Sequence, residues 1–79
     1  KQYDVVLANI QADVLLKNSD LLVGQVRDGG TLVLSGILTR EMENVEAGFL
    51  ERIDAIGAKT SPKRESLNEW SSLRFNLGK

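Results

Sequence analysis

The chain has 79 residues, of which 42% are hydrophobic and 27% charged, and its ten basic and eleven acidic side chains leave a net charge of −1. This length suits one small domain, and the charge gives no general attraction to DNA or to an anionic membrane. The chain contains neither Cys nor His, which excludes disulfides, thiol and imidazole catalysis, and zinc sites that need those ligands. We expect no metal site, and we expect a cytoplasmic protein.

The first expected element is a strand over residues 2–8, with the apolar run Val5-Val6-Leu7-Ala8 at its centre. An unbroken apolar run rich in β-branched residues indicates a strand buried on both faces, as in a parallel sheet covered by helices. Such a strand needs neighbouring strands and two helical layers, so we expect the chain to be a piece of a larger protein. In these sheets ligands collect at the carboxyl ends of the strands, and Asn9 lies at that end.

A helix is expected after a turn at residues 9–13, with Asn9 or Asp13 as its N-cap. A weak break is expected at residues 18–20, and Arg27 with the two glycines that follow predicts the end of the helix at residues 27–30. The side chains along one side of this helix repeat at helical spacing: Val14, Leu15, Asn18, Leu22 and Val26.

A second apolar strand is expected at residues 31–34, followed by Ser35 and by Gly36, which permits a tight turn or a close backbone approach. Thr39 is the expected N-cap of a second helix that ends at Gly57. The buried stripe of that helix is predicted to consist of Met42, Val45, Phe49, Ile53 and Ile56.

The last third is expected to form an antiparallel hairpin. Residues 59–66 are polar and contain the only Pro, so they form an edge strand at best. Residues 70–77 alternate, with Leu73, Phe75 and Leu77 on one face. Trp70 is expected to pack in the core or within the hairpin, and the basic residues Lys59, Lys63 and Arg64 to form a solvated loop. The predicted fold is α/β, in the order β-α-β-α-β-β, with the first two strands parallel.

Two runs of sequence resemble a known family. They are Tyr3-Asp4-Val5-Val6-Leu7-Ala8-Asn9-Ile10 and the run DGGTLVLSGIL from Asp28 to Leu38. They resemble the C-terminal half of class I methyltransferases that use S-adenosylmethionine, and more narrowly the PrmA family, which methylates a ribosomal protein of the large subunit. In that family one strand ends in Ala-Asn-Ile/Leu, and the next follows a Gly-Gly turn and ends in Ser-Gly-Ile-Leu. The pair Glu69-Trp70 also fits.

The resemblance implies that residues 1–79 are part of a Rossmann-like methyltransferase domain that ends in an antiparallel hairpin. The family's glycine-rich cofactor loop and its N-terminal recognition domain have no counterpart in this sequence. We therefore do not expect the chain alone to bind S-adenosylmethionine well or to be active. The resemblance implies that the intact enzyme is a monomer and that its partner is a ribosomal protein. It implies no direct contact of the enzyme with DNA or with a membrane.

The resemblance also implies site residues. Asn9 takes the place of the Asn in the Asn/Asp-Pro-Pro-Tyr motif of amino-directed methyltransferases, while Ile10-Gln11-Ala12 replaces Pro-Pro-Tyr, which favours a protein substrate over a nucleobase. Asn9 is then catalytic, because its amide oxygen can orient the lone pair of an amine. Ala8 and Asn9 would contact the cofactor. The implied substrate-binding residues are Asn9, Ile10, Ser35 and Gly36.

Other interpretations remain open at this point. Asn9 can serve as a cap or turn residue, and Ser35 with Gly36 can form a plain turn. The chain can also be a non-catalytic α/β interaction module or an excised subdomain. The distal half of a nicotinamide-dependent dehydrogenase fits the topology, but the chain offers no His or Cys for proton chemistry. We further predict that the isolated chain is marginally stable or self-associates through the unpaired edge Tyr3–Ala8.

Overall fold

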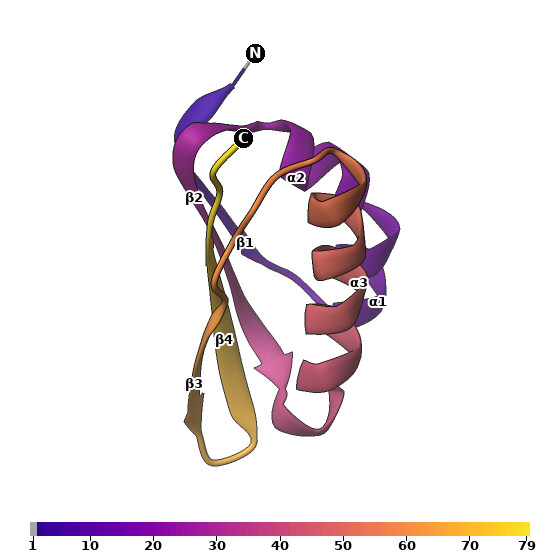
Figure 1. Cartoon of the computed structure of the whole chain (residues 1–79). Helices are drawn as coiled ribbons and strands as arrows, with labels where there is room; N and C mark the ends of the chain where they lie inside the picture. The colour runs from indigo at the N-terminus through magenta and orange to yellow at the C-terminus, as the bar shows by residue number, and fades with distance from the viewer. Residues whose placement is uncertain (1) are drawn as a thin grey trace.

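A computed structural model describes residues 2–79 as one sheet with helices on one of its faces (Figure 1). Its elements have the predicted order, except that the first helix is divided in two. The four strands lie in the order β1-β2-β4-β3. The elements are β1 (Tyr3–Asn9), α1 (Ala12–Lys17), α2 (Ser19–Gly24), β2 (Val26–Leu38), the 3₁₀ helix η1 (Thr39–Glu41), α3 (Met42–Ala55), β3 (Lys63–Leu67) and β4 (Trp70–Asn76).

The strand pairings agree with the predicted topology. β1 and β2 are parallel, whereas β2 with β4 and β4 with β3 are antiparallel. β3 is an edge strand, as its polar sequence predicted, and β1 forms the other edge of the sheet. The free edge at Tyr3–Ala8 therefore exists within residues 2–79, while self-association through it stays a prediction.

The hydrophobic core lies between the sheet and the helices. Phe49 of α3 and Phe75 of β4 stack with their ring centroids 6.0 Å apart, which fastens the longest helix to the sheet. The alternating face of β4 is buried as predicted, at Leu73, Phe75 and Leu77. The predicted stripe of α3 is confirmed at Met42, Val45, Phe49 and Ile53, but it is wrong at Ile56, which follows the helix and is 52% exposed.

The prediction that the first strand is buried on both faces is wrong for the described chain. Val6 is buried, whereas its neighbours Val5 and Leu7 are 55% and 74% exposed. Alternate side chains of a strand point to opposite faces of a sheet. The helices therefore cover the face that carries Val6, and within residues 2–79 no helix covers the face that carries Val5 and Leu7.

The first helix is shorter than its sequence pattern predicted. Asn18 interrupts it, as expected, but α2 ends at Gly24 and not at residues 27–30. Val26 is a buried residue of β2 that pairs with Tyr3, and Gly29 adopts a φ of 81° within that strand. An apolar residue at this position satisfies both the helical repeat and the strand pattern, and the pairing with β1 decides between them.

The predicted N-caps are also wrong. α1 follows Gln11 without any side-chain cap hydrogen bond, so neither Asn9 nor Asp13 caps it. Thr39 opens η1 rather than α3. Its hydroxyl donates to the Asn68 carbonyl at 3.2 Å and lies 2.8 Å from Ser71 Oγ. Thr39 therefore fastens the segment that precedes α3 to the turn of the hairpin.

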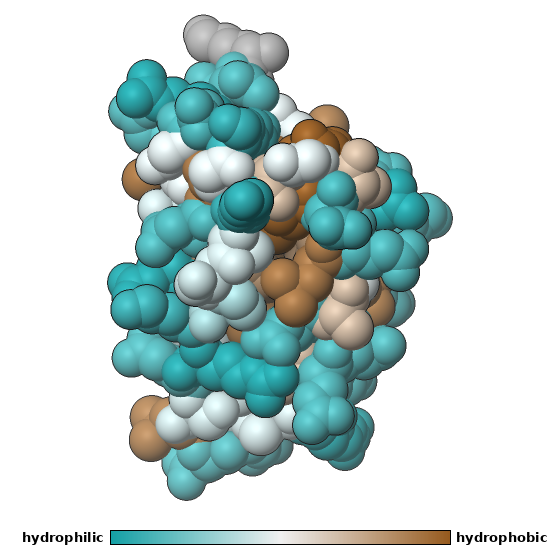
Figure 2. Space-filling model, in the orientation of Figure 1, coloured by the Kyte–Doolittle hydropathy of each residue, from teal (hydrophilic) through white to brown (hydrophobic). Residues whose placement is uncertain are grey.

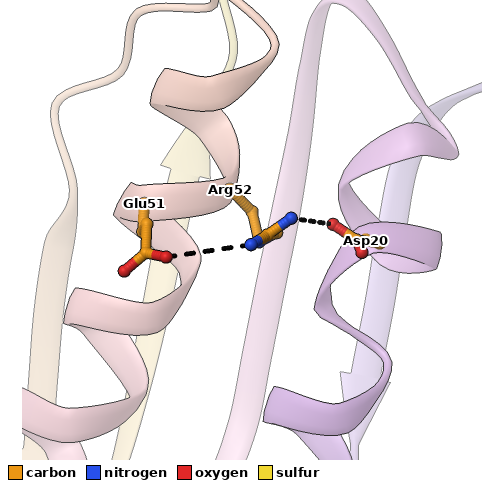
Figure 3. A network of polar contacts seen from close by, with 3 residues as sticks. All are labelled: Asp20, Glu51 and Arg52. Atoms are coloured by element: carbon orange, nitrogen blue, oxygen red, sulfur yellow. Dashed lines mark hydrogen bonds and ion pairs between the residues drawn. The ribbon is translucent and has the colours of Figure 1, made fainter.

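Hydrophilic side chains cover most of the surface seen in Figure 2, and several form ion pairs. Arg52 of α3 donates a hydrogen bond to Asp20 of α2 at 2.9 Å, and this ion pair joins the two helices (Figure 3). Arg52 also lies 3.7 Å from Glu51 of its own helix. Arg64 of β3 donates two hydrogen bonds to Glu46 of α3, at 2.9 and 2.5 Å. Lys63 and Arg64 thus belong to a strand and not to the solvated loop that the sequence predicted.

The helices among residues 2–79 include none that is both long and apolar enough to cross a membrane.

Replacing Phe49 with Ala should lower the free energy of unfolding by about 3–5 kcal/mol, because it removes a buried ring and leaves a cavity. Ile56→Ala is the control, since this exposed side chain was assigned to the same stripe. Its substitution should change stability by less than ~0.5 kcal/mol. Urea denaturation measures both values, and comparable losses would show that Ile56 belongs to the core.

The hydrogen bonds from Arg64 lower the pKa of Glu46. A carboxyl whose pKa is lower in the folded state stabilises the fold above its unfolded-state pKa, and this contribution disappears as the pH falls through the folded-state pKa. We therefore expect Glu46→Gln to lower the melting temperature at pH 7, and the deficit to vanish well below pH ~4.3. Glu51→Gln, at an exposed and longer ion pair, is the control with little effect. A deficit from Glu46→Gln that persists at low pH would contradict this account.

Candidate functional site

The carboxyl ends of the two parallel strands meet at one edge of the sheet. Asn9, the last residue of β1, lies opposite Ser35 of β2, and Ala8 lies opposite Leu34. Ile10 follows Asn9 and is 41% exposed, whereas Ala8 is partly buried against the core. The structure therefore brings together the two segments in which the sequence placed the site, while the roles of their residues stay predictions.

Gly36 determines how closely the two segments approach. It adopts a φ of 73°, in the left-handed region that favours glycine. A Cβ atom added at Gly36 would overlap Oδ1 of Asn9. The side-chain amide of Asn9 thus occupies the space that any other residue at position 36 would fill, which is the close approach that the sequence suggested.

A cavity of about 300 Å³ opens beside Gly36. Its wall comes from the start of α1, the end of β2, η1 and the first residue of β4. Of the site residues implied by the sequence, Gly36 lines the cavity and Asn9 reaches its border through the contact with Gly36. Ala8, Ile10 and Ser35 lie outside the wall. The lining residues are Gln11, Ala12, Asp13, Gly36, Leu38, Glu41 and Trp70.

Sequence reasoning missed Trp70 as part of this site. Trp70 pairs with Leu67 in the hairpin and with Leu38 on its other side, but it is 52% exposed and lies outside the core. Of the two predicted places for Trp70, the core is therefore wrong, whereas the hairpin agrees with its pairing with Leu67. One signal was available, because the last strand begins at Trp70 and an antiparallel partner of the second strand begins near that strand's carboxyl end.

Two acidic residues of the cavity were likewise given only structural roles from the sequence. Asp13 was a candidate cap, and Glu41 lies in the first turn of the helical segment that opens at Thr39, yet both line the cavity. Each follows the carboxyl end of a parallel strand closely in sequence, which is where ligands of such sheets bind. Proximity to a strand end was thus the usable signal for both.

The cavity suits a positively charged group. Its lining residues include the acidic Asp13 and Glu41 and the aromatic Trp70, and neither Lys nor Arg is among them. Carboxylates attract cations, and the face of an indole ring is the best aromatic surface for an ammonium group. No group of three or more acidic side chains within residues 2–79 is placed to hold a metal ion.

Comparison with known proteins identifies the family. The model of the family "Ribosomal protein L11 methyltransferase (PrmA)" matches residues 1–77. The chain belongs to the PrmA family.

Curated members of the PrmA family are similar to most of the chain. A protein named ribosomal protein L11 methyltransferase from Geotalea uraniireducens is 43% identical over 76 residues, which cover 96% of this chain and 22% of that protein. One of the same name from Thiobacillus denitrificans is 54% identical over 48 residues, covering 61% of this chain and 16% of that protein. The chain thus spans about a fifth of the length of these relatives.

A solved structure shows that the fold is shared. The crystal structure of a ribosomal protein L11 methylase from Lactobacillus delbrueckii subsp. bulgaricus superposes with a TM-score of 0.80 at 20% sequence identity. The superposition covers 99% of this chain and 38% of the other.

Gly36→Ala should move the amide of Asn9. We compare it with Gly57→Ala, because Gly57 has a similar φ of 76° but open space where its Cβ would lie. Each substitution should cost about 1–2 kcal/mol for the left-handed backbone. Only Gly36→Ala should shift the NMR signals of the Asn9 side-chain amide, and unchanged signals would contradict the contact described above.

Proposed function

We propose that this chain is the amine-positioning part of an S-adenosylmethionine-dependent methyltransferase, and that the intact protein methylates amino groups of a large-subunit ribosomal protein. The observation that carries the proposal is the amide of Asn9, held against Gly36 beside a cavity lined by Asp13, Glu41 and Trp70, in a chain of the PrmA family. The names of the relatives support the substrate class. Methylation of a ribosomal protein would take place in the cytoplasm.

The sheet itself supports a larger domain. β1 is rich in apolar residues, but it lies at an edge of the sheet and one of its faces has no helix within residues 2–79. These features fit the C-terminal half of a Rossmann-like sheet whose further strands and helices continue beyond β1. In the intact enzyme the cofactor-binding loop and the recognition domain would belong to that further part.

The residues of the site fit the positively charged substrate of such a reaction better than its cofactor. S-adenosylmethionine supplies an electrophilic methyl group on a positively charged sulfur. The volume of the cavity, about 300 Å³, lies at the lower end of the ~300–1,000 Å³ of typical ligand pockets, so it suits one long side chain better than a whole nucleoside. We propose that the cavity binds the substrate amine and that Ala8 and Asn9 contact the cofactor.

In the proposed mechanism the chain draws an ammonium group into the cavity and orients the free amine for methyl transfer. Asp13, Glu41 and the indole of Trp70 draw the substrate ammonium into the cavity. The ammonium then loses one proton to solvent, which leaves the nitrogen with the free lone pair that methyl transfer needs. Oδ1 of Asn9 then accepts a hydrogen bond from a remaining N–H group, which points the free lone pair at the methyl group. A neutral amide suits this step, because a carboxylate in direct contact would keep the amine protonated.

The proposal predicts that Asn9→Ala, made in the intact enzyme, lowers kcat/KM by ~100-fold or more, because the amine loses its orientation. Stability should hardly change, since Asn9 is exposed and caps no helix. Asn44→Ala is the matched control, because Asn44 is an exposed residue of α3 outside the cavity wall. Transfer of radioactive methyl groups to the isolated ribosomal protein measures the rates. Wild-type turnover by Asn9→Ala would overturn the proposed role of Asn9.

A further inference from the structure

A row of apolar side chains crosses three strands at the end of the sheet that carries the cavity. Leu38 of β2 lies opposite Trp70 of β4, and Trp70 lies opposite Leu67 of β3. Residues directly opposite each other in a sheet point to the same face. The neighbouring pair, Ile37 and Ser71, is buried, so this apolar row points to the face of the sheet opposite the core. The apolar row consists of Leu38, Trp70 and Leu67.

The apolar row begins in the wall of the cavity. Leu38 and Trp70 line the cavity, whereas Leu67 lies beyond it on the edge strand and is 76% exposed. Neighbouring strands are ~4.8 Å apart, so the row extends about 10 Å from Leu38 to Leu67. A single exposed leucine is ordinary on a protein surface. A row of apolar side chains that continues the wall of a cavity indicates a binding surface.

Hydrogen bonds hold the turn of the hairpin in place beside the cavity. The backbone N–H of Thr39 donates to the Glu69 carbonyl at 2.7 Å, and the Thr39 hydroxyl donates to the Asn68 carbonyl at 3.2 Å. Thr39 begins η1, which also carries Glu41 of the cavity wall. In Figure 1 the hairpin turn and the segment after β2 lie at the same end of the molecule. The apolar row is therefore ordered before a ligand binds, which lowers the entropic cost of binding.

We propose that the apolar row binds an apolar side chain of the substrate, two residues away from the residue whose amine is methylated. This inference rests on the function proposed above. It makes Leu67 a specificity-determining residue of that reaction. The cavity takes the amine, and the apolar row takes the part of the ribosomal protein next to it.

The spacing of an extended peptide fits this arrangement. Side chains on one side of such a peptide recur at every second residue, ~6.7 Å apart. The Cβ atoms of directly opposed residues such as Trp70 and Leu67 are ~5 Å apart. A substrate residue that places its amine in the cavity beside Trp70 therefore brings the side chain two positions away over Leu67.

The test measures kcat and KM of the intact enzyme with the isolated ribosomal protein, by transfer of radioactive methyl groups. Leu67→Thr removes the exposed apolar side chain and keeps a residue that suits a strand. We expect it to raise KM by about 5- to 10-fold through the loss of an apolar contact. The value of kcat should stay within about 2-fold, because the contact is the same in the ground state and the transition state. Leu67→Ile should keep the wild-type KM.

Ile56→Thr is the matched control. Ile56 is 52% exposed and directly follows α3, whereas η1 and the cavity lie before the start of that helix. A helix of this length separates its two ends by about 21 Å. Ile56→Thr removes a comparable exposed side chain far from the apolar row, and it should leave both kinetic constants unchanged.

The same contact can be tested from the side of the substrate. Mass spectrometry of the methylated ribosomal protein locates the modified residues, and the apolar residue two positions away is then replaced with Ser. With the wild-type enzyme this replacement should raise KM by about 5- to 10-fold. With Leu67→Thr it should raise KM by less than about 2-fold further, because both changes remove one shared contact.

The proposal is overturned if Leu67→Thr leaves KM unchanged, if Ile56→Thr raises KM equally, or if the changes in enzyme and substrate multiply. It is also overturned if no modified residue has an apolar residue two positions away. A lower melting temperature or an altered sedimentation of Leu67→Thr, with KM unchanged, would show that another part of the enzyme or a second copy covers Leu67. If the wild-type enzyme does not methylate the ribosomal protein, the proposed function itself fails.

Discussion

The parallel pairing of β1 with β2 is the constraint on which the rest of the structure depends. It places Asn9 opposite Ser35 and brings the left-handed turn at Gly36 against the amide of Asn9. It also makes Val26 part of a strand and thereby ends the preceding helix. A shift of this register by one residue would turn Val6 outward and Leu7 into the core. The core and the site are therefore determined by the same set of strand contacts.

Two features of the fold, the close approach at Gly36 and the pairing of the hairpin with β2, bring the groups of the site together. The close approach at Gly36 holds a neutral amide at the end of the parallel strands. The hairpin brings Trp70 to the same end through its antiparallel pairing with β2, and the hydroxyl of Thr39 links that hairpin to the segment that carries Glu41. A neutral acceptor beside an acidic, aromatic cavity suits the capture and orientation of an amine. Membership of the PrmA family is consistent with this chemistry.

The sequence predicted those features that depend on local patterns. The stripe of α3 as far as Ile53 and the alternation of β4 follow directly from the 3.6- and two-residue periods, and the structure has both. Gly36 and Gly57 were recognised as turn residues because glycine tolerates a positive φ. The grouping of Asn9 with Ser35 and Gly36 followed from the rule that parallel strands end at the same edge of a sheet.

Features that depend on tertiary partners were not predictable in this way. Val26 fits a helix and a strand equally well, and pairing with Tyr3 decides its state. Trp70 has a core-like side chain, but its place at the tip of a hairpin leaves it at the mouth of a cavity. Val5 and Leu7 are apolar and were predicted to be buried, but they are exposed because no helix within residues 2–79 covers their face of the sheet. Their burial would require a further layer.

The contact between Asn9 and Gly36 can be measured directly by NMR in the 79-residue chain. We predict nuclear Overhauser effects between the side-chain amide protons of Asn9 and the α-protons of Gly36, together with the pattern of cross-strand contacts that parallel strands give between residues 5–9 and 31–35. An antiparallel pattern, or the absence of contacts between Asn9 and Gly36 in a folded sample, would contradict the account of both the fold and the site.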